Sequence, residues 1–228
     1  MAKLRIEGGR RLSGRIVVEG NKNSALPLLA ACLLTDQECV LSNVPRIRDV
    51  DVLLELMAGL GATIDRAGPG TIRVRCQKIV SDRPDPILVG KLRGSVLLLG
   101  PLLARRGSAW LAQPGGDFPA RRTISTHLQA LAQMGAVQLD EPGHVLKAPN
   151  GLSGASFYLD EASVTGTETA LLGRQVRKDA PRSVIPPWSR TSWSSAGSCG
   201  RWVCPSRGKE PRRSVSRGPH GSGLRSIV

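Results

Sequence analysis

The sequence predicts an α/β protein over about its first 172 residues, followed by a segment of different character. Short strands alternate there with segments whose apolar residues recur at helical spacing. Part of this pattern returns at an offset of 74 residues, which indicates copies of one supersecondary unit around a shared core. The composition then changes within a few residues of Gly173, which sets the boundary of the body.

The predicted elements follow one another along this body. An apolar strand is predicted at Gly14–Glu19, and a helix over Ala25–Leu34 follows it after a short turn. Two further helices and two further strands have the expected patterns: the helices Asp49–Leu60 and Ile124–Met134, and the strands Thr71–Arg75 and Ala109–Ala112. Both of these later helices should end at a glycine, Gly61 and Gly135, because a left-handed residue commonly follows a helix.

The body repeats itself in sequence. Leu54–Ala62 corresponds to Leu128–Ala136, and a second match upstream links two pairs of segments about 70 residues apart: Leu33-Leu34 with Leu102-Leu103, and Cys39–Leu41 with Ala109–Leu111. Each unit is predicted to contain a helix, a strand, a helix and a hairpin. A third unit begins at Thr167–Leu172.

The segment 173–228 holds ten of the net fourteen positive charges of the chain, and it is rich in Ser, Arg, Gly and Pro. Such a composition predicts disorder, because too little apolar surface is available to offset the entropy of ordering. One interpretation is a basic arm whose tryptophans stack on bases. The favoured interpretation is that this segment is coding DNA read out of frame, so nucleic acid is not expected as a partner. Cys199 and Cys204 alone make a weak metal site, so no metal is expected.

No run of eighteen apolar residues and no signal-peptide pattern occurs, so we expect a cytoplasmic protein without a membrane span. The five cysteines show no pairing framework. Cys32 and Cys39 lie in apolar surroundings and are predicted to be buried thiols.

The turn Gly20–Ser24 is the most informative short motif. A strand that passes through glycine into a helix presents free backbone N–H groups at the positive end of the helix dipole, and such an end attracts phosphate. Lys22 adds a positive charge there, and the Asn23 side chain can both donate and accept hydrogen bonds. The alternative is an ordinary turn with Ser24 as the N-cap and a solvated lysine.

Four segments of the body are informative together: VEGNKNSALPLLAACLL (18–34), NVPRIRDVDVLLELMAGLGA (43–62), LRGSVLLLGPLLAR (92–105) and the PGGD loop (114–117). In combination they resemble one enzyme family, the UDP-N-acetylglucosamine 1-carboxyvinyltransferases. The resemblance covers about residues 1–172 in order and with matching spacing. The related shikimate-pathway enzymes have Lys followed by Ser in the first turn, whereas here Asn23 follows Lys22, which favours the UDP-sugar branch.

The resemblance implies an inside-out α/β barrel built from repeated βαβαββ units, with the active site in a cleft between two domains. On this basis, residues 1–21 are the first strands of an otherwise missing C-terminal-type domain, and residues 22–172 form an incomplete repeat-built domain. The segment 173–228 is the tail. The chain is about half of the length expected for the family, so its own activity is expected to be low.

The implied reaction transfers the enolpyruvyl group of phosphoenolpyruvate to the 3′-hydroxyl of UDP-N-acetylglucosamine and releases phosphate, without a metal or organic cofactor. General-acid delivery of a proton and fixed positive charges suit this chemistry. The resemblance assigns catalytic roles to Lys22 and Asp117. The substrate-binding positions that it implies are Lys22, Asn23, Arg93, Arg122, Ser163, Val164 and Thr165.

Three positions in this assignment depart from the family or stay open. Asp117 stands where the family usually has cysteine, so a carboxyl group would replace a thiol as proton donor. Arg121 is the alternative to Arg122 if the loop register slips by one residue. His127 has the spacing of a family histidine, and a capping or packing role is an equal alternative. A repurposed, non-enzymatic domain is the second functional hypothesis.

Overall fold

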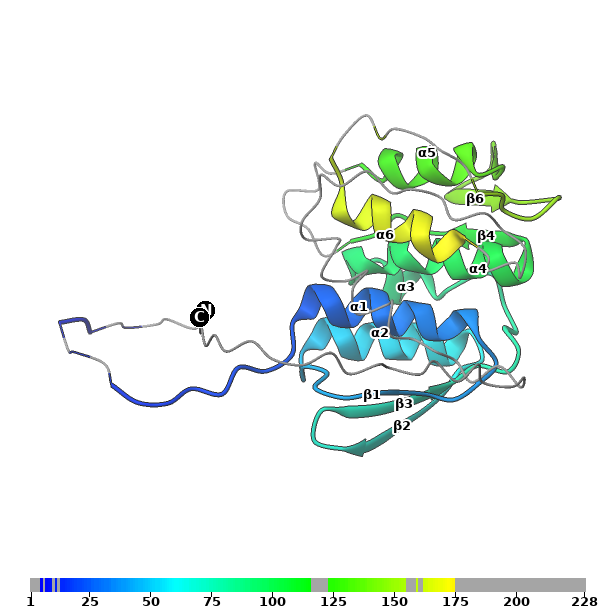
Figure 1. The fold of residues 1–228 in the computed structure, drawn as a ribbon. Coiled ribbons are helices and arrows are strands. Elements are labelled where there is room, and N and C mark those ends of the chain that lie inside the picture. The colour runs from blue at the N-terminus through cyan, green and yellow to red at the C-terminus, as the bar shows by residue number, and fades with distance from the viewer. Residues whose placement is uncertain are drawn as a thin grey trace, which may run out of the picture.

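The computed structural model describes residues 5, 7–9, 11, 13–115, 123–154, 159 and 162–174. These residues form two copies of a helix–strand–helix–hairpin unit and the first helix of a third (Figure 1). The first unit contains α1 (Lys22–Ala31), η1 (Cys32–Leu34), β1 (Cys39–Leu41), α2 (Arg48–Gly59), β2 (Thr63–Gly68) and β3 (Thr71–Arg75). The second contains α3 (Pro86–Val89), η2 (Arg93–Leu98), α4 (Leu99–Arg106), β4 (Ser108–Leu111), α5 (Ser125–Gln133), β5 (Val137–Leu139) and β6 (His144–Lys147). The third begins with α6 (Val164–Gly173).

The two sheets have the same topology, which confirms the repeat predicted from the sequence. Their strand orders are β1-β3-β2 and β4-β6-β5, and every pairing is antiparallel. In each sheet the last strand of the hairpin lies in the centre, with Cys39 opposite Val74 in the first unit and Ala109 opposite Leu146 in the second. The two sheets remain separate, so the barrel is not closed over the described residues.

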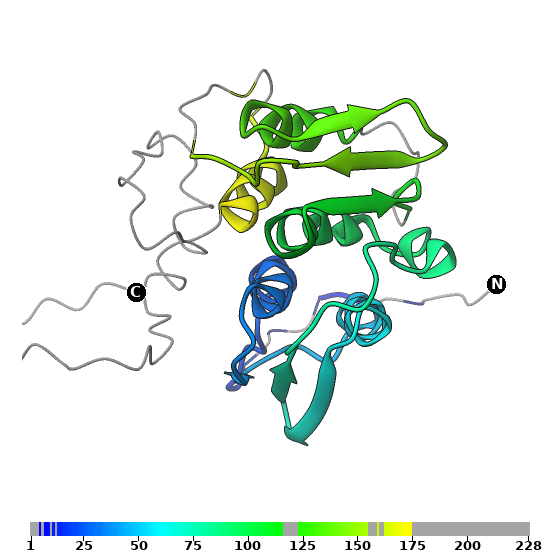
Figure 2. The ribbon, with the colours of Figure 1, turned by 90° about the vertical axis from the view of Figure 1, so that its right-hand side faces the viewer.

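The first helices of the three units pack together at the centre, and the sheets lie outside them (Figures 1 and 2). Helix α4 packs along α6, and α1 contacts both η2 and α6. Gly100 allows α4 and α6 to approach closely, since a Cβ at this position would lie 2.8 Å from the backbone N of Gly173. The core is dominated by leucine, with Leu29, Leu53, Leu99 and Leu102 fully buried. Burial of such side chains is the main driving force for this packing.

Arg105 links the two units through backbone carbonyl groups. Its guanidinium donates to Leu33 O at 3.0 Å, to Cys76 O at 2.7 Å and to Gln77 O at 2.9 Å. Leu33 lies in η1, and Cys76 and Gln77 directly follow β3, so all three carbonyls belong to the first unit. One side chain at the end of α4 therefore holds the first unit against the second.

Several predicted elements are confirmed and others are corrected. The strand Thr71–Arg75 has the predicted limits, and helices α2 and α5 lie within one or two residues of prediction. Both helices are followed by a glycine of positive φ, at 104° in Gly61 and 100° in Gly135. Cys32 and Cys39 are buried free thiols, as predicted.

The prediction of a strand at Gly14–Glu19 is wrong for this structure. The segment forms no strand, and Ile16, Val17 and Val18 are 89%, 82% and 82% exposed. A β-prone sequence needs a neighbouring strand to satisfy its backbone groups, and none of the described residues provides one. The tail, residues 175–228, lies outside the described part of the chain, as do its predicted disorder and its Cys199–Cys204 pair.

Candidate functional site

Helix α1 begins at Lys22, earlier than the sequence suggested. Asn21, not Ser24, is its N-cap, because the Asn21 side chain accepts from the backbone N–H of Asn23 at 2.7 Å. Lys22, Asn23 and Ser24 therefore form the first helical turn. Lys22 and Asn23 are exposed there, so their side chains can reach a ligand at the positive end of the helix dipole.

Lys22 forms an ion pair with Asp49, the second residue of α2. The Lys22 side chain is 51% exposed and that of Asp49 is 32% exposed, so water and ligands can reach both groups. An acidic residue in the first turn is favourable for α2 as well, since it offsets the helix dipole. Asp49 thus holds the lysine between the starts of two helices without burying it.

Arg93 occupies the corresponding place in the second unit, at the first residue of η2. Its Nη2 donates to Thr123 O at 2.6 Å, just before α5. Thr123 is 74 residues after Asp49, which is the offset of the sequence repeat. In both units, a cation at the start of a helix before the first strand contacts the equivalent position near the start of the helix after that strand.

Ser163 is the N-cap of α6. Its Oγ accepts from the backbone N–H of Gly166 at 3.0 Å, and its carbonyl accepts from Thr167 Oγ1 at 2.9 Å. Val164 and Thr165 follow in the first helical turn, and both are exposed. These three predicted substrate-binding residues therefore all lie at a helix start, where backbone N–H groups favour an anionic ligand.

His127 connects this turn to α5. Its Nδ1 lies 2.8 Å from Thr169 Oγ1, and its Nε2 lies 3.2 Å from Thr165 Oγ1. The ring is 3% exposed. Burial, and to a smaller extent the nearby positive charge of Arg93, lower the pKa of His127 to about 4. The imidazole is therefore neutral near pH 7, and its two hydrogen bonds favour a packing and positioning role.

The helix starts lie at one end of the molecule. Leu26, one turn into α1, meets η2 so closely that a Cβ on Gly94 would lie 2.9 Å from Leu26 Cδ1. Together with the Lys22–Asp49, Arg93–Thr123 and His127–Thr165 contacts, this places α1, α2, η2, α5 and α6 with their first turns on the same side, the left in Figure 1. We call this side the helix-start face.

Asp117, Arg121 and Arg122 lie outside the described residues, so their placement relative to the helix-start face stays a prediction. The loop that leads to them is described as far as Gly115. Gly115 donates its N–H to Val89 O at 3.2 Å, and a Cβ on Gly115 would lie 1.7 Å from Gly90 O. Only glycine fits this contact, which fixes where the loop leaves the body.

Sequence reasoning missed two residues near this face. Asp49 lies in the segment 43–62, but its contact with Lys22 depends on the packing of α1 against α2. Glu168, in α6, is 5% exposed, and burial raises its pKa to about 7. An acidic residue inside the apolar start of the third unit was the available signal.

Among the residues described, no group of three potential metal ligands converges, and no helix is long and apolar enough to cross a membrane.

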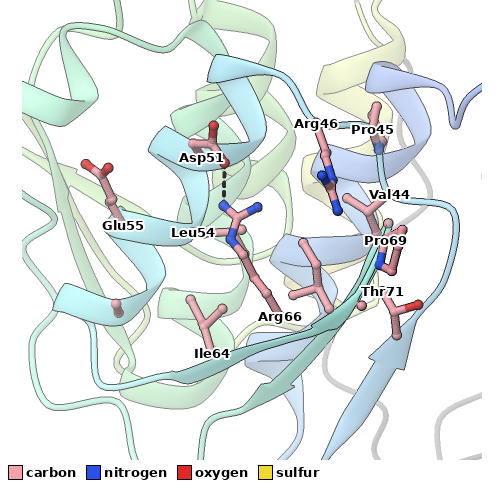
Figure 3. Close-up of a pocket in the computed structure, with 14 residues that line it drawn as sticks. Val44, Pro45, Arg46, Asp51, Leu54, Glu55, Ile64, Arg66, Pro69 and Thr71 are labelled. Carbon is pink, nitrogen blue, oxygen red and sulfur yellow. Dashed lines mark hydrogen bonds and ion pairs between the residues drawn. The ribbon is translucent and has the colours of Figure 1, made fainter.

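A groove of about 870 Å³ lies elsewhere, between α2 and the β2–β3 hairpin (Figure 3). The ion pair of Arg66 with Asp51 spans it, and Leu54 and Ile64 contribute apolar surface. None of the site residues predicted from the sequence lines it. The groove belongs to the first unit, whereas the helix-start face combines helices of all three units.

Comparison with known proteins places the chain in a family. Residues 6–185 match the family described as EPSP synthase (3-phosphoshikimate 1-carboxyvinyltransferase). The chain is 47% identical over 167 residues to the UDP-N-acetylglucosamine 1-carboxyvinyltransferase of Bradyrhizobium diazoefficiens, covering 73% of this chain and 38% of that protein. It is 40% identical over 176 residues to the enzyme of the same name from Wolinella succinogenes, covering 77% of this chain and 42% of that protein. The chain thus spans about two fifths of the length of these relatives.

Solved structures agree with the sequence match. The fold is similar to that of the enolpyruvyl transferase NikO from Streptomyces tendae, with a TM-score of 0.60 and 26% identity, over 73% of this chain and 39% of that chain. EPSP synthase from Acinetobacter baumannii shares the fold, with a TM-score of 0.56 and 17% identity, over 70% of this chain and 37% of that chain. The chain therefore belongs to the EPSP synthase family of carboxyvinyl (enolpyruvyl) transferases.

Proposed function

We propose that the helix-start face is one wall of a UDP-N-acetylglucosamine 1-carboxyvinyltransferase active site. The reaction transfers the enolpyruvyl group of phosphoenolpyruvate to the sugar 3′-hydroxyl with release of phosphate, a cytoplasmic step of peptidoglycan precursor synthesis. The observation that supports this most is the gathering of Lys22, Arg93 and the Ser163–Thr165 turn on one face. The names of the two relatives described above support the choice of substrates.

The residues of this face suit anionic substrates. Lys22 would meet the phosphate or carboxylate of phosphoenolpyruvate and exchange Asp49 for the ligand, since the ion pair is open to solvent. Asn23 would donate to and accept from the sugar nucleotide. Arg93 and the first turn of α6 would bind the diphosphate, where positive charge and helix N–H groups add to each other.

Asp117 is the proposed proton donor to the methylene carbon. A carboxyl group can act this way when burial raises its pKa, but it cannot be alkylated as a thiolate is. A full-length relative with aspartate at this loop position should resist fosfomycin, the epoxide that targets the usual cysteine. Treating such a protein with the epoxide and measuring its mass tests this, and a covalent adduct on the loop would contradict it.

Activity of this chain alone is expected to be low, because the residues that bind substrate from the opposite side would lie in the part of the relatives that it does not match. Binding is therefore the better test than turnover. The full chain should bind UDP-N-acetylglucosamine in calorimetric titration, and Lys22→Ala should weaken phosphoenolpyruvate binding at least tenfold. Lys78→Ala is the matched control, because Lys78 is an exposed lysine away from this face. Equal effects of the two substitutions would contradict the assignment.

The basic composition of residues 173–228 favours one alternative, a nucleic-acid-binding arm on a repurposed domain. Translating the coding DNA after Leu172 in the other frames distinguishes the two cases. Recovery of a continuing third unit supports the transferase. Tight DNA binding with a steep salt dependence, and no continuing unit in any frame, would support the arm.

A further inference from the structure

A chain of hydrogen bonds runs from the core to the helix-start face. Thr169 is fully buried in α6, and its Oγ1 lies 2.8 Å from His127 Nδ1. On the other side of the ring, Nε2 lies 3.2 Å from Oγ1 of Thr165, which is exposed in the first turn of the same helix. The ring thus joins a buried hydroxyl to an exposed one.

The direction of the first bond follows from burial. Thr169 Oγ1 has His127 Nδ1 as its hydrogen-bond partner, and the described residues give it no second one. A buried hydroxyl that fails to donate its hydrogen leaves an unsatisfied donor, which is costly, whereas a spare acceptor lone pair is tolerated more easily. Thr169 should therefore donate to Nδ1. The ring proton then sits on Nε2 and is donated to Thr165 Oγ1.

From this geometry we infer that the Thr169–His127–Thr165 chain fixes the Thr165 hydroxyl as an outward hydrogen-bond donor for a phosphate oxygen of a nucleoside diphosphate. The inference rests on the proposed function for the identity of the ligand. Thr165 would contact the ligand, and Thr169 and His127 would be positioning residues. Because Thr165 Oγ1 already accepts from the ring, its own hydrogen is directed away from His127.

Two observations support the chain. Burial and Arg93 lower the pKa of His127 to about 4, so the ring is neutral near pH 7 and one nitrogen remains free to accept from Thr169. Ser163 Oγ, the neighbouring hydroxyl, accepts only from a backbone group, Gly166 N–H. Thr165 differs because its partner is the His127 ring, which the buried Thr169 orients from the other side.

The tautomer tests the bond directions directly. The full chain, labelled with 15N in histidine, should give His127 signals typical of the Nε2–H tautomer, and His127→Gln identifies these signals among the three histidines. Thr169→Val should shift the ring toward a mixture of tautomers, and Thr169→Ser, which keeps the hydroxyl, should restore Nε2–H. An Nδ1–H tautomer in the parent chain, or no change in Thr169→Val, would overturn the inference.

Ligand binding tests the consequence, with UDP-N-acetylglucosamine as the probe. Thr165→Val should weaken binding about tenfold and Thr165→Ser much less, because a hydrogen bond to a charged oxygen is lost only in the first. Thr169→Val should weaken binding about threefold, and this loss should vanish in the Thr165→Val background. If Thr169→Val still weakened binding about threefold in the Thr165→Val background, Thr169 would not act through Thr165 and the inference would be wrong. Absence of binding by the parent chain counts against the proposed function, whereas the tautomer decides the hydrogen-bond directions on its own.

Discussion

The two complete units have the same fold but different polar chemistry. In the first, Lys22 pairs with the carboxylate of Asp49, and the position four residues later is Leu53, fully buried. In the second, Arg93 contacts the backbone of Thr123, and the residue 74 positions after Leu53 is His127. The same interior position therefore holds an apolar side chain in one unit and an imidazole in the other.

This difference separates what builds the fold from what builds the site. The apolar positions repeat because each unit must bury the same helix faces and the same sheet face. His127 departs from that pattern, and it is tolerated because α6 supplies Thr165 and Thr169 as partners. The residues that break the repeat are therefore the better candidates for function.

The largest expected effect comes from placing a histidine at position 53, which is the equivalent of His127 in the first unit. Leu53→His should destabilise the protein by about 4 kcal/mol, because it removes a buried leucine and leaves a polar ring in the core. Leu53→Met is the control for size and should cost less than about 1.5 kcal/mol. Urea denaturation measures both. A Leu53→His variant as stable as Leu53→Met would show that the two units are interchangeable at this position.

The pH dependence of stability should separate His127 from Glu168. The pKa of His127 falls to about 4 on folding, so its contribution to the free energy of unfolding is present above pH 6.5 and is lost as the pH falls through 4. The pKa of Glu168 rises to about 7 on folding, so its contribution to the free energy of unfolding is present below pH 4.5 and is lost as the pH rises through 7. Each shift corresponds to about 3 kcal/mol.

Glu168→Gln should therefore stabilise the chain by up to about 3 kcal/mol at pH 8 and have little effect at pH 4.5. Urea denaturation at the two pH values measures the difference. An equal effect at both values would show that Glu168 ionises normally in the folded chain.

The sequence predicted the repeated parts well and the contacts between units poorly. Helices α2 and α5 and their glycine ends follow from local periodicity, which each segment carries in itself. The partners of Lys22 and His127 depend on packing between elements far apart in the chain, so no local pattern reveals them. The strand at Gly14–Glu19 failed for the same reason, because a strand depends on a neighbour.

Arg105 tests how the two units are held together. Arg105→Met should cost about 2 kcal/mol, because the carbonyls of Leu33, Cys76 and Gln77 lose their donor at the boundary between units. Arg105→Lys should retain only part of this stability, because an ammonium group lacks the planar set of donors that a guanidinium offers to several carbonyls. In thermal denaturation with a probe in each unit, the two units should unfold at different temperatures in Arg105→Met and together in the parent chain. Unchanged stability would mean that apolar packing alone joins the units.

The smallest expected effect concerns Asp49. Asp49→Asn should change the free energy of unfolding by less than about 1 kcal/mol, because the ion pair is partly exposed. Phosphoenolpyruvate should bind about twofold tighter, since Lys22 loses a competing carboxylate. Asp51→Asn, which removes the partner of Arg66 in the groove, is the control and should leave this affinity unchanged. A large loss of stability in Asp49→Asn alone would assign the pair a structural role.

The central claim is that substrate binds where the helices begin. Titration of the 15N-labelled chain with UDP-N-acetylglucosamine, followed by NMR, tests it most directly. We expect the largest amide shifts in the first turns of α1, η2, α5 and α6, around Lys22, Arg93 and Thr165. Shifts confined to the groove between α2 and the β2–β3 hairpin would contradict the account.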